Sequence, residues 1–202
     1  MFYNITFGLI RQVVCFVDIF PRRKYNKPMN DHMKETLGKP LRSFRLPRYA
    51  HLPDVGLYLE QTTQYINRCL APLGCVEITS SMIRNYVKMG LVHHPVGKQY
   101  FADQIAHLIV IAILKHTLAL EHIGALFRLQ QLVYTDQVAY DYFCTELENI
   151  LHFRFGLKDS VDDVGVTSSL EKEMLRSAII SVSHYIYLNA CFGLLSGENT
   201  EA

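Results

Sequence analysis

The sequence contains no tryptophan and only five cysteines in 202 residues. The cysteines are scattered and odd in number, and none has the Cys-x-x-Cys spacing that structural zinc favours. This does not fit a small secreted disulfide scaffold, so we expect reduced, buried thiols in a cytoplasmic protein. Charged residues make up 19% of the chain and hydrophobic residues 50%, which is typical of a globular rather than a disordered protein.

Motifs of catalysis are also missing. The sequence contains no Gly-x-Ser-x-Gly, His-Glu-x-x-His or phosphate-binding glycine loop. A triad can be drawn on paper from Ser80 or Ser81 with His107 or His116 and Asp103. Both histidines, however, lie in an otherwise apolar stretch and are better explained as packed or surface histidines. We therefore predict a protein that is not an enzyme and needs no cofactor.

Charge is unevenly distributed along the chain. Residues 1–53 hold ten Lys/Arg and three Asp/Glu, a net charge of +7. Residues 54–134 have a net charge of +1, with six and five, and residues 135–202 have −7, with four and eleven. A basic front and an acidic back indicate different tasks for the two ends, although charged faces are often only solvated surface.

The N-terminal segment does not have the features of a signal peptide or a transmembrane helix. Arg11 and Asp18 interrupt its apolar run, and no cation precedes that run. Our hypothesis is that the first 28 residues are an over-long gene start, with Met29 or Met33 as the true start. Residues 21–53 are rich in proline and basic residues and predict an extended arm, which could lie against phosphates or serve as a solubilising tail.

Beyond residue 53 the hydrophobic periodicity predicts a mainly helical chain. Asp54 is the expected N-cap of a first helix that Pro72 and Gly74 end, and Thr79 or Ser80 caps a short second helix that ends at Gly90. A small hairpin is expected next, from its Pro/Gly centre. The hairpin is expected at residues 91–101. Later helices are expected at residues 102–115, 120–133, 135–155 and 170–195.

Two helices joined by a turn and followed by a hairpin have the order of a winged helix-turn-helix. In such a unit the second helix is short because it enters a major groove instead of a core. We therefore expect an all-α (mainly) fold, with a winged helix-turn-helix followed by C-terminal helices. The predicted regions are an arm at 1–42, the winged unit at 43–134, and a helical hairpin for dimerisation or effector binding at 135–202.

The stretch MIRNYVKMGLV resembles the second-helix pattern of the MerR superfamily. Arg84, Tyr86, Gly90 and Leu91 match that pattern, whereas Asn85 stands where the first aromatic residue is found. The resemblance implies a MerR-like winged helix-turn-helix.

The stretch VGKQYFADQIAHLIVIAILKHTLALEHI is similar to the wing and next helix pair of the same superfamily. Lys98, Tyr100 and Asp103 occupy its basic, tyrosine and acidic places. Together the two stretches cover residues 79–126. The sequence departs from the pattern at residues 117–119, and its tail has no clustered cysteines, which argues against metal sensing.

A wider pattern, LPRYAHLPDVGLYLEQTTQYINRCL followed by ITSSMIRNYVKMGLV and KQYF, resembles the bacterial family called domain of unknown function 1836 (DUF1836). This resemblance spans roughly residues 43–155. It implies a MerR-like winged helix and supplies no activity.

The polar side of the short helix is the candidate DNA contact. Helix N-terminal amides and hydroxyls suit phosphate oxygens, and Arg and Asn read base edges. Residues 78–102 contain no acid, as a phosphate-facing surface requires, although a capped surface helix would look the same. The predicted wing adds further contacts, and its Tyr100 is better explained as a packing residue that anchors it. The candidate residues are Thr79, Ser80, Ser81, Arg84, Asn85, Lys88, His93, His94, Lys98, Gln99 and Tyr100.

Neither the adjacent histidines nor the last helix points clearly to another ligand. His93 and His94 point in opposite directions on a strand and have no nearby Cys or carboxylate, so we predict no metal site.

Residues 177–195 contain no charged side chain, and a stretch of this length is nearly long enough to span a membrane. Their serines, histidine and asparagine make that helix polar for a lipid-facing span, which favours a dimer interface or an effector pocket against residues 135–155, and no membrane.

These observations favour a cytoplasmic transcriptional regulator that binds double-stranded DNA as a homodimer, with an unknown small molecule as its effector. The alternative is a protein-interaction module that has kept the winged-helix fold but no longer binds DNA. Its support is the small net charge of the winged region.

Overall fold

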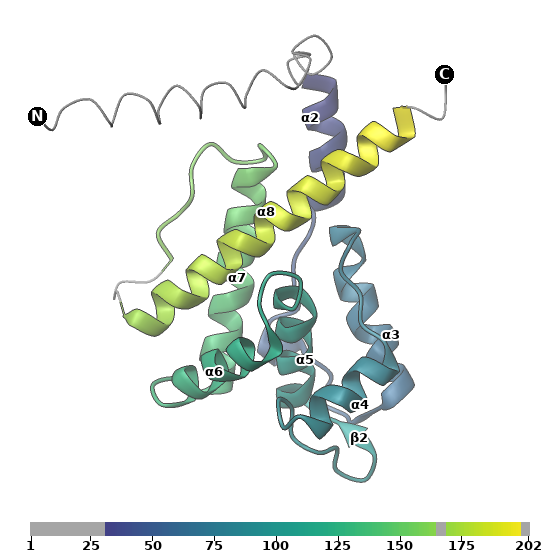
Figure 1. Ribbon diagram of the computed structural model, residues 1–202, viewed down its shortest axis with the longest axis vertical. Helices are drawn as coiled ribbons and strands as arrows, with labels where there is room; N and C mark the ends of the chain where they lie inside the picture. The colour runs from purple at the N-terminus through teal and green to yellow at the C-terminus, as the bar shows by residue number, and fades with distance from the viewer. Residues whose placement is uncertain (1–30, 165–168, 199–202) are drawn as a thin grey trace, which may run out of the picture. The chain divides into compact units, whose positions relative to one another are not determined.

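The computed structural model describes residues 31–164 and 169–198, which are mostly helical with one small two-stranded sheet (Figure 1). This confirms the expected mainly-α class. The chain divides into a unit that ends at Lys34 and a unit that begins at Glu35. Of the first unit, the described part is the opening turn of one helix, where Lys34 Nζ donates to Asp31 Oδ1 at 3.3 Å.

Short helical and extended segments come first and long helices follow. Three 3-10 turns connect them: η2 (Lys39–Leu41), η3 (Tyr49–His51) and η4 (Ala71–Leu73). Strands β1 (Leu57–Tyr58) and β2 (Gln99–Tyr100) form the sheet. The helices are α2 (Asp31–Gly38), α3 (Leu59–Leu70), α4 (Ser80–Lys88), α5 (Ala102–Leu114), α6 (Leu120–Gln131), α7 (Asp136–Arg154) and α8 (Leu170–Glu198).

The expectation of an extended arm is wrong for residues 31–38, which form α2. The reason is the position of the prolines: Pro28 precedes this helix and Pro40 falls in the first turn of η2, where a missing N–H costs little. Leu37 and Leu41, which both belong to the second unit, are buried in its core. The hypothetical start at Met29 and the first basic cluster lie outside the described residues.

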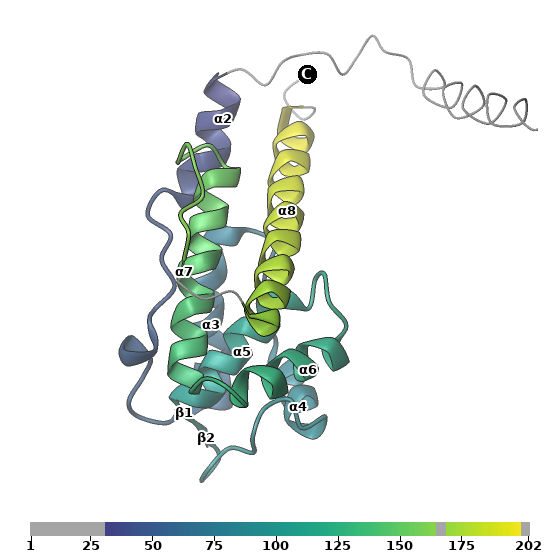
Figure 2. The same cartoon turned by 90° about the vertical axis from the view of Figure 1, so that its left-hand side faces the viewer.

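Helix α5 is the centre of the core. Ten of its residues, from Gln104 to Leu114, are buried. It packs against α3, α6, α7 and α8, and the two views agree on this central place (Figures 1 and 2). A helix that is apolar on nearly all sides needs neighbours on all sides, and the four surrounding helices provide them.

Helices α7 and α8 pack along one another (Figure 2). Helix α8 turns Leu175, Ile179, Val182 and Ile186 inward. Its residues Leu170–Ser196 are long and apolar enough to cross a membrane by length and composition, and 28% of the most apolar window is buried inside the protein. A packed core helix passes the same test.

Candidate nucleic-acid interface

Helix α4 is held in place by caps at both ends. The Thr79 hydroxyl accepts the Met82 backbone N–H at 3.3 Å, and Thr79 is extended as an N-cap should be. Gly90 follows the helix with a φ of 72°, a conformation that glycine adopts without steric cost. The predicted beginning and end of this helix are therefore confirmed. Its inward face, made by Ile83, Tyr86 and Val87, is buried.

The opposite side of α4 is open to solvent and carries the cations that the sequence singled out. Arg84, Asn85 and Lys88 are exposed, as is Ser81 in the first turn. Asn85 Nδ2 lies 3.4 Å from Met89 Sδ, a weak contact that leaves its carbonyl oxygen unused. Within the described residues neither Arg84 nor Lys88 makes an ion pair, so both charges can approach an external anion without breaking an internal contact.

Ser80 has a different role from the one expected. It is half-buried, and its hydroxyl donates to Glu60 Oε2 at 2.9 Å and lies 3.0 Å from Thr63 Oγ1. These contacts attach the first turn of α4 to the first half of α3. They also place a carboxylate beside the N-terminus of α4, where a phosphate would otherwise be favoured. Ser80 thus holds the first turn of α4 against α3.

Asn67 fixes the chain that leads into α4, and sequence reasoning missed it. Its side chain accepts the Ile78 N–H at 2.8 Å and donates to the Ile78 carbonyl at 2.9 Å. Ile78 is itself buried, so this side chain replaces the pairing that its backbone lacks. An asparagine in the middle of an amphipathic helix gives no sign of this role, because its partner is eleven residues further along.

The predicted hairpin is present as a two-residue turn. Val96 and Gln99 exchange both backbone hydrogen bonds at 3.0 Å, and Gly97 and Lys98 between them have φ values of 58° and 67°. Two positive φ values in a row are those of a type I′ turn, which suits a tight hairpin. Lys98 is exposed at the tip of this wing.

The base of the wing is packed on the segment that precedes α3. Strand β2 pairs antiparallel with β1, with Leu57 opposite Tyr100. Asp54 is therefore not the N-cap of α3: the strand takes residues 57 and 58, and Tyr58 caps the helix, with its N–H donated to Gln61 at 2.9 Å. A Cβ on Gly56 would lie 2.7 Å from that of Gln99, so the two segments touch closely.

Two of the expected wing contacts have structural roles. Tyr100 is only 4% exposed, which agrees with a packing residue and removes it from the contact surface. Gln99 is half-buried and donates to the Gly56 carbonyl at 3.1 Å. His93 and His94 are exposed, and Gln104 Nε2 donates to both of their carbonyls, at 3.2 and 2.9 Å.

The basic residues at 42–48 make ion pairs and hydrogen bonds within the protein. Arg48 donates to both oxygens of Glu148, at 2.7 and 2.9 Å, and the same carboxylate accepts the Leu46 N–H at 2.8 Å. Arg45 Nε lies 3.7 Å from Glu148, and Arg42 pairs with Glu35 at 3.2 Å. This pairing raises the pKa of Arg48, chiefly through the hydrogen bond to Glu148.

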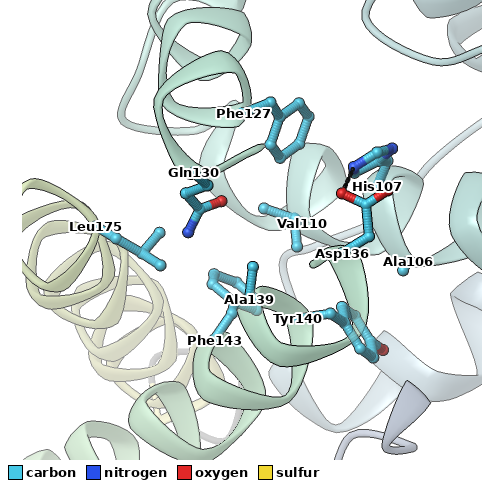
Figure 3. Close-up of a pocket in the computed structure, with 10 residues that line it drawn as sticks. All are labelled: Ala106, His107, Val110, Phe127, Gln130, Asp136, Ala139, Tyr140, Phe143 and Leu175. Carbon is cyan, nitrogen blue, oxygen red and sulfur yellow. Dashed lines mark ion pairs between the residues drawn. The ribbon is translucent and has the colours of Figure 1, made fainter. Parts of the chain in front are cut away.

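The histidines of the hypothetical triad are half-buried against aromatic rings of other helices. His107 Nε2 lies 3.5 Å from Asp136 Oδ1 beside a cavity of about 20 Å³, room for about one water molecule (Figure 3). Phe127 covers the His107 ring, with centroids 4.6 Å apart. His116 stacks on Tyr185 of α8 at 4.9 Å. Within the described residues neither histidine is hydrogen-bonded to Ser80 or Ser81.

A second, larger cavity of about 160 Å³ lies where α6 and α7 meet the start of α8. Its walls include Tyr134, Val138, Tyr142 and Leu175. It lies between the two segments in which the sequence predicts an effector pocket. Among the described residues no three His, Cys, Asp or Glu side chains gather as a metal site would require.

The fold and the site together define a mostly helical domain that presents a capped, cationic helix and a tight hairpin. Residues 47–143 match the model of a family described as domain of unknown function (DUF1836). The match supports the family resemblance seen in the sequence. No curated protein and no solved structure matches the chain.

Proposed function

We propose that this protein is a DNA-binding transcriptional regulator of MerR-like winged helix-turn-helix type, acting in the cytoplasm as a homodimer. The observation that carries the proposal is the exposed side of α4. Arg84, Asn85 and Lys88 are exposed on a helix capped at both ends, and no acid occurs in residues 78–102. An Arg and an Asn held on a short exposed helix are suited to base edges in a major groove.

Lys98 adds a second point of contact at the tip of the wing. The hairpin is anchored at its base by Gln99, Tyr100 and Gln104, so its exposed tip is displayed on a fixed support. A cation in such a position suits the phosphate backbone, which positions a protein on the duplex without reading sequence. His93 and His94 flank the same surface.

A specific observation favours the alternative, a protein-interaction module that has lost DNA. Glu60 lies at the N-terminus of α4 and accepts the Ser80 hydroxyl at 2.9 Å. A carboxylate at this end repels the phosphate that a recognition helix commonly receives there. Ser80 lies one turn before Arg84 on the same side of α4, so Glu60 borders the cationic face at its N-terminal end. The DNA proposal rests on Arg84 and Lys88, which are exposed and make no ion pair with Glu60 in the described structure.

The test is selection of bound fragments from a genomic DNA library, followed by affinity measured across salt concentrations. The affinity of the wild type should fall steeply with salt, and Arg84→Ala or Lys88→Ala should lower the slope of log K against log salt by about 1. Arg42→Ala is the charge-matched control, because η2 packs on η4 at the far end of α3 from Ser80. If no DNA is bound at low salt, the proposal is wrong.

A further inference from the structure

The cavity of about 160 Å³ where α6 and α7 meet the start of α8 has no part in the proposed DNA contact. A dry apolar cavity of about 150 Å³ is large enough for a benzene molecule, so this space has room for one aromatic ring with a small substituent. Val138 in its wall is 53% exposed, so the cavity reaches the surface there. A small molecule can therefore enter beside Val138 without opening of the core.

The walls of this cavity suit a flat, apolar ring. Leu175 is only 2% exposed and forms the inner wall. Aromatic rings come from Tyr134 and Tyr142, and aliphatic carbon atoms come from Val138 and Ala139. Aromatic and aliphatic side chains are the usual lining of small-molecule sites, because they cover an apolar ring and exclude water from it.

The two charged side chains in the wall have opposite signs. Lys172 Nζ lies 5.4 Å from the centre of the Tyr142 ring, which is a cation–π contact. Glu171 precedes it in the first turn of α8. Hydrogen bonds from the N–H of Glu171 and from the Ser169 hydroxyl lower the pKa of the Glu171 carboxyl group, which is therefore ionised at neutral pH. A charged ligand meets a like charge beside the opposite one, whereas an uncharged ligand meets no repulsion.

Gln130 provides the polar part of the wall. It is half-buried and lines both this cavity and the small cavity beside His107. Figure 3 shows its amide between Leu175 and Ala139, which also line both cavities. Within the described residues the Gln130 side chain makes no hydrogen bond, so its carbonyl oxygen and its NH₂ group are both open to a ligand.

We infer that this cavity binds an uncharged molecule with one aromatic ring and a group that both donates and accepts a hydrogen bond, as a carboxamide does. The ring lies among Tyr134, Tyr142 and Leu175, and the polar group pairs with the Gln130 amide. The inference rests on the proposed function only in making this molecule the effector of the regulator. Binding itself requires no DNA.

Water alone fits the cavity less well than such a ligand. A buried water molecule needs about two to four polar partners, and most of this wall is apolar. A ring with a carboxylate or an ammonium group has the right size but meets the like charge of Glu171 or Lys172. An uncharged ring with one polar group avoids both difficulties.

The test is a titration of the full chain without DNA, followed by its amide NMR spectrum, with benzamide as the probe. Benzamide should bind with a Kd of about 1 mM or lower and shift the signals of the residues that line the cavity. Benzoate and benzylamine carry a charge on the same ring, and each should bind at least about tenfold more weakly. No shifts up to about 10 mM benzamide, shifts confined to other residues, or equal binding of either charged ring overturns the inference.

Gln130→Leu tests the polar contact. It should weaken benzamide at least about fivefold, as the loss of a hydrogen bond implies, and leave the affinity for toluene unchanged because toluene has no polar group. Gln137→Leu, at an exposed glutamine of α7 outside the cavity wall, is the matched control and should bind both ligands like the wild type. Wild-type affinity for benzamide in Gln130→Leu contradicts the inference.

Ala139→Leu tests the space itself and decides the matter if Gln130→Leu does not fold. Its added carbon atoms narrow the cavity and should weaken benzamide and toluene alike, by at least about tenfold. Unchanged affinity for both ligands would show that they bind elsewhere. A chain that binds benzamide but no DNA removes the regulator and keeps the ligand site, whereas a chain that binds DNA but not benzamide removes only the ligand site.

Discussion

At the scale of single residues, the decisive distinction is between cations that are free to meet an external ligand and cations that the fold uses. Arg84 and Arg48 are the same residue type in stretches that both looked basic. Arg84 is exposed beside an apolar helix face, whereas Arg48 holds Glu148, which is 5% exposed, through two hydrogen bonds. The difference arises because Glu148 lies one hundred residues away and meets the arm only in the fold.

Arg48 should therefore matter for stability. Arg48→Ala leaves the Glu148 carboxylate buried without its main counter-charge, which should lower the free energy of unfolding by about 3 kcal/mol. Arg42→Ala removes an exposed partner of Glu35 and should cost less than about 1 kcal/mol. Urea unfolding of the two variants checks this, and equal effects would show that the Arg48 pair contributes no more than a surface contact.

At the scale of elements, α3 and α4 form a unit through polar side chains as well as apolar packing. Asn67 binds both backbone groups of Ile78, while Ser80 bonds Glu60 and Thr63. Lys115 at the end of α5 donates to the Glu77 carbonyl at 2.7 Å. These contacts fix the direction in which α4 leaves the core, and hence the direction of its exposed side.

Asn67→Ala tests whether the hydrogen bonds to Ile78 hold α4 in place, because it removes them without changing the exposed face of α4. The variant leaves the buried Ile78 N–H and carbonyl unpaired, which should cost roughly 2 kcal/mol of unfolding free energy. DNA affinity should fall as well, because Arg84 and Asn85 lose their fixed orientation. Gln64→Ala, at an exposed position on the same helix, is the control in both measurements. Unchanged stability in Asn67→Ala would mean that water replaces the two hydrogen bonds between Asn67 and Ile78.

At the scale of the whole molecule, three histidines are held in the described structure in environments that disfavour their charge. Burial lowers the pKa of His107, His116 and His152, while Asp136 partly opposes this at His107. A folded-state pKa below the ordinary value means that the unfolded chain binds more protons as the pH falls. The stability that these neutral rings contribute is therefore complete above the unfolded pKa and is lost below about pH 6.5.

The protein should accordingly become less stable between pH 7.5 and pH 5.5. His107→Phe, which keeps a ring against Phe127, should reduce this change, as measured by the urea midpoint at the two pH values. His122→Phe is the control, because His122 is exposed on α6. A pH dependence in His107→Phe as steep as that of the wild type would show that His107 does not contribute.

The order of the helices beyond residue 53, the caps of α4 and a small hairpin before α5 were predictable, because each depends on residues a few positions apart. Thr79 and Gly90 mark the ends of α4 through local hydrogen bonds and a positive φ. The predicted N-cap at Asp54 was wrong because pairing of β1 with β2 moved the start of the helix. The predicted extended arm was wrong at residues 31–38 because the prolines lie on either side of a helix.

The sequence by itself determined a mainly helical chain, a short capped helix with Arg84, Asn85 and Lys88 on its polar side, and a last helix without charged side chains over residues 177–195. Only the tertiary structure decided which of those polar groups remain exposed. Glu60 reaches Ser80, and Glu148 reaches Arg48, because helices distant in sequence pack side by side. Local hydrogen bonds and hydrophobic periodicity depend on residues that are neighbours in the sequence. Burial and charge pairing depend on residues that folding brings together.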